Sequence, residues 1–403
     1  MKFGLIRERK NPPDRRVVLS PAACQKVLNQ FDGIEIVAES SPIRVFEDAE
    51  YRAADIPVAD DVSDCDVLLG VKEVPIDALI PEKKYFFFSH TIKKQPYNRD
   101  LLRAILEKRI ELYDHEVLTN TKGVRLVAFG RYAGIVGAYN GIRAYGLKYG
   151  DFKLPKAETL SDREALIEAL RGIELPAIKI LLTGRGRVGS GAREILDGMG
   201  LRQVTVADYL EKEFREPVYC QIDASEYNKR KDGVRGNKAD FFANPEAYRS
   251  NFFRFARVTD LFIAGHFYGQ GAPYLFTRED ARHPEFRIRV VADISCDIDG
   301  PVASTIRPST IADPVYGYDP ATESETDFKN PRAIAVMAVD NLPAELPRDA
   351  SEGFGAAFVK QVIPAFFDGD ADGILERARM TKDGTLTDRY AYLQDYVDNI
   401  PAP

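Results

Sequence analysis

The chain is poor in cysteine and lacks any long apolar run. Its four cysteines, Cys24, Cys65, Cys220 and Cys296, show no C-x-x-C spacing. We therefore expect buried, reduced thiols in a reducing compartment, and neither a disulfide framework nor a metal site. No apolar run approaches the roughly 20 residues that span a bilayer, and residues 1–8 hold no signal-peptide core. A cytoplasmic protein without a membrane partner is expected.

An excess of positive charge is also missing. The 403 residues include 55 Lys and Arg against 62 Asp and Glu, a formal net charge of −7. This balance argues against nucleic acid or an anionic membrane as a partner. Internal repeats and low-complexity tracts are absent as well. What remains is the composition of an ordinary soluble enzyme, 45% hydrophobic and 29% charged, with enough length for two cores.

Short apolar runs alternate with helical patterns along the first part of the chain. Ser20 and Pro21 form the pattern of a helix N-cap followed by proline, and this helix is predicted to reach about Asn29. Another helix is predicted over 98–108. We interpret five apolar runs as strands: 3–6, 34–37, 67–71, 85–89 and 111–114. Such alternation predicts a mostly parallel sheet that helices cover on both faces.

A helix rich in small residues, 132–149, is expected to lead from this first domain into a second one. Each of its glycines costs about 1 kcal/mol relative to alanine, so close packing against another backbone is the expected compensation. Residues 322–332 are predicted to be an exposed loop, and 334–339 a strand that precedes the return to the first domain. The other strands of the second domain are predicted at 178–183, 203–207, 260–264 and 288–293.

The predicted fold class is α/β, with two Rossmann-like domains that are each a mostly parallel sheet flanked by helices, and a cleft between them. The substrate and catalytic domain is discontinuous and comprises 1–131 and 341–403. The dinucleotide-binding domain comprises 132–340 and contains an insertion at about 221–257.

This insertion is polar, aromatic and basic, and it does not fit the simple alternation of strands and helices. We favour either a surface excursion whose aromatic side chains cover a core edge, or a subunit contact that would make a homo-oligomer. A lid or substrate role is a less favoured alternative. One short aromatic and basic cluster in an acidic chain is weak evidence for nucleic-acid binding.

A glycine motif provides the strongest functional signal. Gly184, Gly186 and Gly189 follow a predicted strand and open a predicted helix, with the spacing G-x-G-x-x-G. The first glycine permits a tight turn, the second lets a pyrophosphate approach the backbone, and the third lets helix and strand pack closely. The helix N-terminus points unpaired N–H groups at the phosphates. We expect these glycines, together with Arg187, to bind a dinucleotide.

The type of dinucleotide depends on an acidic residue. Asp208 lies 24 residues beyond Gly184, after the apolar run 203–207. A carboxylate there accepts hydrogen bonds from the adenosine ribose and repels a 2′-phosphate. The expected cofactor is therefore NAD, with NADP as the alternative.

Two predicted strands of the first domain end in side chains that exchange protons. Lys72 follows the run 67–71, and His90 follows the run 85–89. Open α/β sheets bind ligands at the carboxyl ends of their strands. Burial and neighbouring positive charge lower the pKa of a lysine, and histidine titrates near neutral pH without tuning. We therefore predict that Lys72 and His90 form an acid–base pair.

Other charged residues are expected around this pair. Glu116 follows the next predicted strand and could hold Lys72 or His90 electrostatically. Asp297 follows the strand 288–293, so we expect it near the nicotinamide. Three cations on loops of the first domain suit the recognition of substrate carboxylates: Arg16, Lys93 and Arg125.

Several motifs, taken in order, resemble the NAD-dependent, lysine-forming saccharopine dehydrogenases, which form a superfamily with alanine dehydrogenase and the NAD-binding part of proton-translocating transhydrogenase. The resemblance covers nearly the whole chain except 221–257. It rests on RVVLSP at 16–21, GVKEVP at 70–75, SHTIKKQ at 89–95, GVRLVAFGRYAG at 123–134, GRGRVGSGA at 184–192, DISCD at 293–297, and the DNLP and LPRDAS segments of 340–351.

The resemblance implies the same roles that the residues suggest. Lys72 and His90 match the family's acid–base pair, and Glu116 matches the carboxylate that tunes it. The three cations match its substrate-carboxylate ligands, and Gly184, Gly186, Gly189, Asp208 and Asp297 match the cofactor site. The implied reaction is oxidative deamination of saccharopine to lysine and 2-oxoglutarate. Alanine dehydrogenase or a related opine-type enzyme is the first alternative, and a non-catalytic NAD sensor is the second.

Overall fold

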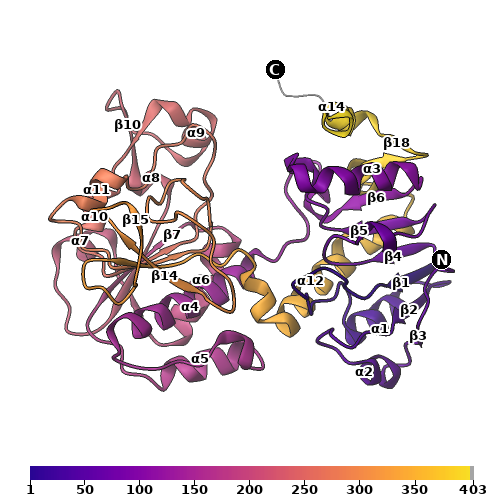
Figure 1. The fold of residues 1–403 in the computed structure, drawn as a ribbon, viewed down its shortest axis with the longest axis horizontal. Helices are drawn as coiled ribbons and strands as arrows, with labels where there is room; N and C mark the ends of the chain where they lie inside the picture. The colour runs from indigo at the N-terminus through magenta and orange to yellow at the C-terminus, as the bar shows by residue number, and fades with distance from the viewer. Residues whose placement is uncertain (400–403) are drawn as a thin grey trace. The chain divides into compact units, whose positions relative to one another are not determined.

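A computed structural model describes residues 1–399 of the chain, which divides into two compact units (Figure 1). Unit 1 comprises Met1–Phe129 and Pro347–Pro403, and unit 2 comprises Gly130–Leu346. Residues 400–403, which the sequence analysis placed in the first domain, lie outside the described residues. Each unit has a sheet flanked by helices, so the predicted α/β class is confirmed.

Unit 1 contains a six-stranded sheet in the order β3-β2-β1-β4-β5-β6, and every pair of neighbouring strands is parallel. The strands predicted from apolar runs are confirmed, with ends that differ by up to two residues. They are β1 Lys2–Leu5, β2 Glu35–Glu39, β4 Val67–Leu69, β5 Lys84–Phe87 and β6 Glu111–Asp114, and the edge strand is β3 Val58–Ala59.

The helices of unit 1 cover this sheet and include two that were predicted. The hydroxyl of Ser20 accepts a hydrogen bond from the Ala23 N–H, as expected of the N-cap before Pro21. The helices are α1 Pro21–Gln30, α2 Asp48–Ala53, α3 Arg99–Glu107, α12 Pro347–Gln361, α13 Ile374–Ala378 and α14 Gln394–Asp398. A small hairpin joins β17 Thr381–Lys382 to β18 Thr385–Leu386.

Unit 2 contains an eight-stranded mixed sheet in the order β15-β14-β16-β13-β12-β7-β9-β8. All neighbours from β16 to β8 are parallel, whereas β14 runs antiparallel to both β15 and β16. The strands are β7 Lys179–Thr183, β8 Arg202–Gln203, β9 Val218–Ile222, β12 Leu261–Ala264, β13 Val290–Asp293, β14 Val315–Asp319, β15 Ser324–Thr326 and β16 Ile334–Met337. Strand β15 lies within 322–332, so the prediction of a loop throughout that segment was wrong.

The strand predicted at 203–207 is also wrong in extent. Strand β8 ends at Gln203, because the Thr205 hydroxyl accepts the Asp208 N–H and caps a short helix, α7 Val206–Glu211. Strand β9 lies between β7 and β8 in the sheet. The strand next to the glycine motif is therefore β9, although it comes later in the sequence.

Two long helices of unit 2 approach each other at glycines. These helices are α4 Gly130–Tyr149 and α6 Arg187–Gly198. A Cβ on Gly134 would stand 1.9 Å from the Val188 carbonyl oxygen, and one on Gly191 would stand 1.9 Å from the Arg131 carbonyl oxygen. The close backbone packing that was expected to compensate for the glycines of α4 is confirmed.

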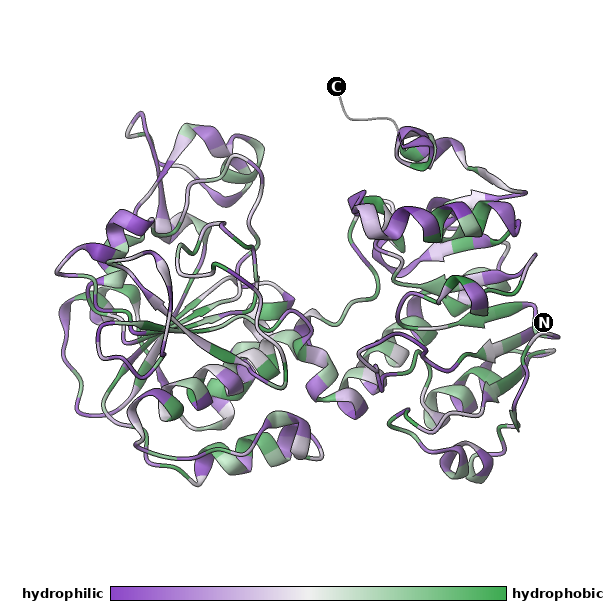
Figure 2. Ribbon diagram, in the orientation of Figure 1, coloured by the Kyte–Doolittle hydropathy of each residue, from purple (hydrophilic) through white to green (hydrophobic). Residues whose placement is uncertain are grey.

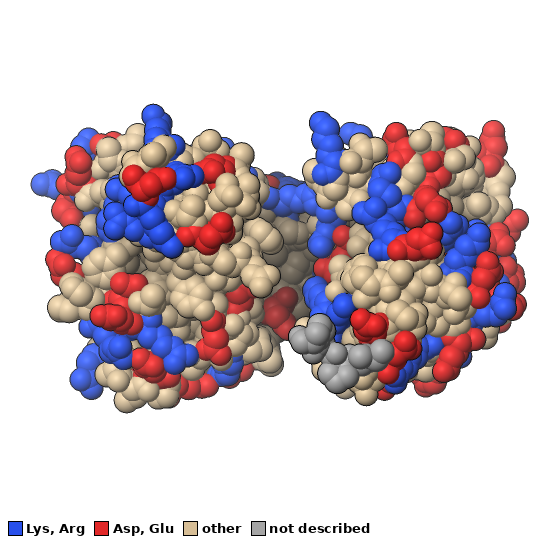
Figure 3. Space-filling view, turned by 90° about the horizontal axis from the view of Figure 1, so that it is seen from above, with Lys and Arg blue, Asp and Glu red and all other residues tan. Residues whose placement is uncertain are grey.

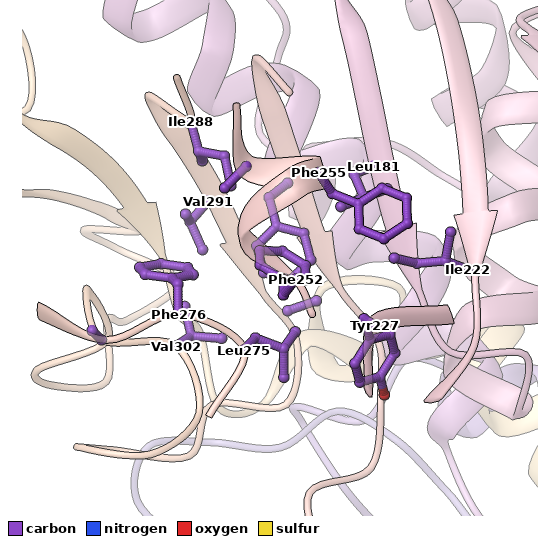
Figure 4. Close-up of a cluster of buried hydrophobic side chains, with 14 of the residues drawn as sticks. Leu181, Ile222, Tyr227, Phe252, Phe255, Leu275, Phe276, Ile288, Val291 and Val302 are labelled. Carbon is purple, nitrogen blue, oxygen red and sulfur yellow. The ribbon is translucent and has the colours of Figure 1, made fainter. Parts of the chain in front are cut away.

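The segment 221–257 folds into α8 Ala224–Tyr227, β10 Asn228–Arg230, α9 Lys238–Ala243, β11 Tyr248–Ser250 and α10 Phe253–Ala256. Tyr227, Phe252 and Phe255 pack in the same buried cluster as Leu181 of β7 and Ile222 of β9 (Figure 4). The aromatic side chains of this segment therefore complete the core of unit 2, as the first interpretation of the insertion proposed.

Hydrophobic residues concentrate on the strands, whereas the helices carry both hydrophobic and polar residues (Figure 2). The remaining helices of unit 2 are α5 Arg163–Arg171 and α11 Arg278–Arg282. Within residues 1–399, no helix combines the length and the apolar character that crossing a membrane requires.

Gly134→Ala should destabilise the protein, because the added methyl group would collide with the Val188 carbonyl of α6. We expect the free energy of unfolding to fall by about 3 kcal/mol or more. Urea denaturation followed by circular dichroism measures the change. Gly172→Ala is the matched control, because a Cβ there meets nothing closer than 3.4 Å. Equal stability of the two variants would contradict close α4–α6 packing.

Candidate functional site

The carboxyl ends of three neighbouring strands of unit 1 carry the candidate catalytic residues. Strands β4, β5 and β6 are adjacent in the sheet, and all run in the same direction. Lys72 lies three residues beyond the end of β4, His90 three residues beyond β5, and Glu116 two residues beyond β6. The parallel sheet therefore brings these turns to one edge.

His90 is hydrogen-bonded to the residue next to Lys72. Its Nδ1 lies 2.6 Å from Oε1 of Glu73, and Oε2 of Glu73 accepts the Lys10 ammonium at 2.6 Å. Burial alone would raise the pKa of Glu73, but the His90 and Lys10 hydrogen bonds lower it to about 2. The ionised carboxylate can only accept, so the proton lies on Nδ1. In the neutral ring, Nε2 is then the nitrogen that can take a proton.

Lys72 stands beside this pair in a partly buried environment. Burial lowers the pKa of its ammonium, and the positive charge of Arg16 lowers it further, while Asp14 and Glu73 oppose the shift. Within residues 1–399, its ammonium forms no hydrogen bond or ion pair. A lysine with a lowered pKa is partly neutral closer to physiological pH, which is what a general base requires.

Arg16 is held by a carboxylate that the sequence analysis did not identify. Its Nε donates to Oδ1 of Asp14 at 3.0 Å and an Nη donates to Oδ2 at 2.6 Å, and both side chains are 3% exposed. The guanidinium also lies 4.2 Å from the centre of the Phe129 ring. Asp14 and Arg16 are only two residues apart in the sequence and could have been recognised as a pair. An acidic residue near an arginine is, however, too common to indicate an ion pair.

Glu116 contacts the two other expected substrate cations, and not Lys72 or His90. Its Oε1 lies 3.3 Å from an Nη of Arg125 and 3.6 Å from Nζ of Lys93. Its Oε2 is buried and has no hydrogen-bond partner within residues 1–399. Glu73, and not Glu116, contacts His90. This is because Glu73 lies on the turn after β4, and His90 lies on the turn after the neighbouring strand β5. The structure thus gathers Glu116, Lys93 and Arg125.

The Asp14–Arg16 pair makes stability depend on pH. Burial would raise the pKa of Asp14, but Arg16 lowers it to about 2. Because the folded-state pKa lies below the usual value, this stabilisation is present above about pH 4 and is lost as the pH falls toward 2. Asp14→Asn should therefore lower the free energy of unfolding at pH 7 by on the order of 2 kcal/mol.

Urea unfolding of wild type and Asp14→Asn at pH 7, 5, 4 and 3 measures this difference. The difference in the free energy of unfolding between the two proteins should become smaller as the pH falls. This difference also includes a contribution from Glu8, because the charge of Asp14 adds to the burial that raises the pKa of Glu8 to about 7. A gap that stays constant from pH 7 to 3 would show that the carboxylate charge does not contribute.

In unit 2, the glycine motif forms a tight turn between β7 and α6. Gly184 has φ +90°, and a Cβ on it would lie 2.4 Å from the carbonyl oxygen of Gly265. A Cβ on Gly189 would lie 2.1 Å from the Gly184 carbonyl oxygen, so only glycine allows this approach of helix and strand. Around Gly186, the residue before α6, no atom lies within 4 Å of a Cβ position. Backbone atoms therefore fill the space beside Gly184 and Gly189, whereas the space beside Gly186 is open.

The turn is also held by a side chain from β9, which the sequence analysis missed. The amide of Gln221 donates to the carbonyls of Gly184 at 2.9 Å and Gly189 at 3.3 Å. Gln221 belongs to the strand that lies beside β7 in the sheet. A glutamine in an otherwise apolar strand could have indicated a structural role. Its hydrogen-bond partners, however, depend on the order of the strands in the sheet.

Two carboxylates come after the edge strand β8 and after β9, the strand between β8 and β7. Asp208 lies in the first turn of α7, partly exposed, and pairs with Lys212 at 2.7 Å. Asp223 directly follows β9, where its oxygens accept the Ala224 N–H at 2.6 Å and the Lys238 ammonium at 3.1 Å. Asp208 was expected to follow a strand directly but lies in a helix, whereas Asp223 directly follows β9, the neighbour of β7.

A basic cavity of about 720 Å³ lies beside Asp223 in the segment 221–257. Glu226 lines it and also accepts a hydrogen bond from Arg185 of the glycine turn at 3.1 Å. Lysine and arginine side chains gather on the face of unit 2 that Figure 3 presents. Five basic residues line the cavity: Lys229, Arg230, Arg235, Lys238 and Arg249.

The other two expected cofactor residues also lie at the carboxyl side of the unit 2 sheet. Arg187 is the first residue of α6 and is exposed. Asp297 lies on the turn after β13, where burial, and then the charge of Asp293, raises the pKa of its carboxyl. Both residues therefore follow strands that flank β12 in the sheet.

Comparison with known proteins confirms the resemblance that the motifs indicated. Residues 4–136 match the family described as alanine dehydrogenase/PNT, N-terminal domain. The chain is 30% identical to the mitochondrial alpha-aminoadipic semialdehyde synthase of Mus musculus over 97% of its own length and 47% of that protein. It is 24% identical to the saccharopine dehydrogenase [NAD(+), L-lysine-forming] of Yarrowia lipolytica, over 89% of the chain and 90% of that protein.

The chain spans 41 to 48% of the length of the semialdehyde synthases that it matches. A solved L-alanine dehydrogenase has the same fold, with a TM-score of 0.65 at 18% identity over 100% of both chains. The α/β fold is therefore shared at a low sequence identity.

Proposed function

We propose that the protein is a pyridine-nucleotide-dependent amino-acid dehydrogenase whose preferred substrate is saccharopine, because residues 4–136 match the alanine dehydrogenase/PNT N-terminal domain family. The observation that carries this proposal is the pairing of His90 with Glu73, next to a Lys72 of lowered pKa, at the carboxyl ends of β4 and β5. We assign unit 1 to the substrate and unit 2 to the cofactor. A soluble, cytoplasmic setting is part of the proposal.

Oxidation at a carbon–nitrogen bond needs a base and then an acid. The oxidised cofactor supplies the hydride acceptor. The substrate nitrogen loses its proton to Lys72 or His90 as the C–H bond breaks, and a C=N bond forms. Water then adds to the carbon of the C=N bond, and one of its protons passes through the same pair to nitrogen. Transfer of the remaining hydroxyl proton to nitrogen, as the C=O bond forms, breaks the C–N bond and releases an amine and an oxo acid.

The tautomer of His90 suits this task. Glu73 holds Nδ1–H, so the ring offers Nε2 for proton exchange and keeps a defined orientation. Lys10 supplies the second contact to Glu73 and prevents that carboxylate from being an unpaired buried charge. Glu73 is therefore assigned to orient the histidine in place of Glu116.

The cations of unit 1 favour a substrate with several carboxylates. Arg16 is the buried cation beside Lys72, and Arg125 and Lys93 form a second group around Glu116. Saccharopine carries carboxylates on both sides of its secondary amine, whereas alanine has only one. Two separate cationic groups fit the larger substrate, since charge-assisted hydrogen bonds position carboxylates strongly.

The glycine turn of unit 2 fits the pyrophosphate of a dinucleotide. Space at Gly186 and the N-terminus of α6 would admit phosphate oxygens, and Arg187 adds a positive charge there. We assign Gly184, Gly189 and Gln221 to shaping this turn, and Asp297 to the nicotinamide side. NAD is the proposed cofactor, as in the name of the Yarrowia lipolytica relative.

One observation favours NADP as the second candidate. Lys238 neutralises Asp223, and four more basic side chains line the cavity beside it. Such an environment attracts a 2′-phosphate and weakens the repulsion that a carboxylate at this position would exert. Initial rates with NAD and NADP under identical conditions decide between the two cofactors.

Lys72→Met should lower kcat by about a hundredfold or more, because it removes the proposed base without changing the cofactor turn. NADH formation with saccharopine at 340 nm measures kcat, and isothermal titration calorimetry measures NAD binding, which should change less than twofold. Lys122→Met, at an exposed lysine of unit 1, is the matched control and should behave as wild type.

The same assay, run with saccharopine, alanine and other amino acids, tests the substrate. We expect turnover with saccharopine and at most a trace with alanine. The opposite order would make the protein an alanine or opine-type dehydrogenase. Cofactor binding without turnover on any amino acid would indicate a sensor.

Asp223→Asn should raise the KM for NAD several-fold, because Asp223 follows the strand beside the glycine turn. Asp208→Asn should change this KM by less than about twofold, since Asp208 lies on a helix beyond the edge strand. Initial-rate kinetics with saturating amino acid give both values. If Asp208→Asn has the larger effect, the sequence-based assignment of the ribose ligand is correct.

A further inference from the structure

A buried carboxylate holds the backbone of the turn that carries Lys72. Glu8 follows β1, the strand that lies beside β4 in the sheet. Its Oε1 accepts the Val71 N–H at 2.7 Å, and its Oε2 accepts the Lys72 N–H at 2.9 Å. Two consecutive amides are therefore bound by two oxygens of one side chain, so Glu8 fixes both the position and the direction of this backbone segment.

The same turn is held from its other side by a residue of unit 1 with no proposed chemical role. His115, just beyond β6, donates its Nε2–H to the Gly70 carbonyl at 2.9 Å. The ring is fully buried among Phe86, Phe88 and Phe354, and burial lowers its pKa to about 4. This imidazole therefore stays neutral and serves as a fixed donor.

We propose that Glu8 is a positioning residue for Lys72, acting through the backbone of residues 70–72. This inference rests on the proposed function, in which Lys72 is the base. With Glu8 and His115 bound at successive peptide groups, Lys72 can shift only if one of these hydrogen bonds breaks. A side chain held this way needs little reorganisation before it accepts a proton.

The proposal depends on both carboxylate oxygens being acceptors. A glutamine keeps one oxygen but presents an NH₂ group to the second N–H, where two donors would face each other. Burial raises the pKa of Glu8 to about 7, and Asp14 raises it too, while the two amides and Arg16 oppose the shift. The two amides of the turn therefore favour the ionised form of Glu8 against the effect of burial.

A second buried carboxylate does the same for the neighbouring turn. Asp114, at the end of β6, accepts the Ser89 N–H at 2.9 Å and the Ser89 hydroxyl, next to His90. Asp114 forms no hydrogen bond to residues 70–73 among the described residues. Asp114→Asn is therefore the matched control, because it removes a buried carboxylate from the same sheet edge without touching the Lys72 turn.

The test measures Lys72 directly in the free protein. Acetic anhydride at low concentration acylates neutral amines, and mass spectrometry of peptides gives the rate at Lys72 from pH 6 to 11. In wild type the rate profile should show a pKa below that of exposed lysines. In Glu8→Gln this pKa should rise toward the ordinary value, because the loosened turn lets the ammonium become hydrated.

Asp114→Asn should leave the Lys72 profile unchanged, and Glu8→Asp, with two oxygens on a shorter side chain, should lie between wild type and Glu8→Gln. Circular dichroism confirms that each variant is folded, and Glu8→Asp serves if Glu8→Gln is not. An unchanged Lys72 profile in a folded Glu8 variant would overturn the proposal. Equal changes in the Glu8 and Asp114 variants would do so too, because they would indicate general loosening.

Steady-state kinetics provide the second readout. Glu8→Gln should lower kcat by about tenfold, with KM for the amino acid changed less than about twofold. Since acylation needs neither substrate nor cofactor, it tests the positioning role even if the protein proves not to be a dehydrogenase. A changed Lys72 profile together with normal turnover would sustain the role of Glu8 and refute that of Lys72.

Discussion

The candidate site of unit 1 depends on burying charged side chains at one edge of a parallel sheet. An isolated buried charge costs several kcal/mol, so each of these groups needs a partner. Arg16 has Asp14, Glu73 has His90 and Lys10, and Glu8 has two backbone amides. Lys72 stands among them with its ammonium unpaired within residues 1–399. The ionic network thus leaves one amine whose pKa is lowered by burial and by the charge of Arg16.

Unit 2 depends on a different constraint, the close approach of backbones. Gly184 and Gly189 bring α6 onto β7, while Gly134 and Gly191 bring α4 onto α6. Because no side chain intervenes at these points, the turn and the helix start are held rigidly by main chain. Gln221 adds hydrogen bonds from the neighbouring strand. Such a turn can receive a ligand at Gly186 without rearranging the core.

Much of the architecture could be predicted because it depends on neighbours along the chain. Apolar runs marked β1, β2 and β4 to β6, Ser20 and Pro21 marked the start of α1, and glycine spacing marked the β7–α6 turn. One failure occurred where a polar residue competes with strand formation. Thr205 caps α7, so the strand expected at 203–207 ends at Gln203.

The chain alone therefore placed Lys72 and His90 at the ends of strands, and it placed three glycines between a strand and a helix, because both features follow from local periodicity. The hydrogen-bond partners of these residues could be assigned only from the tertiary structure. Glu8 is 63 residues from Val71, and Glu73 is 17 residues from His90. Such pairs form only when strands far apart in the chain become neighbours. Strand β9 likewise lies between β7 and β8, so the carboxylate that follows the strand beside the glycine turn is Asp223 and not Asp208. The order of strands in a sheet does not follow their order in the chain.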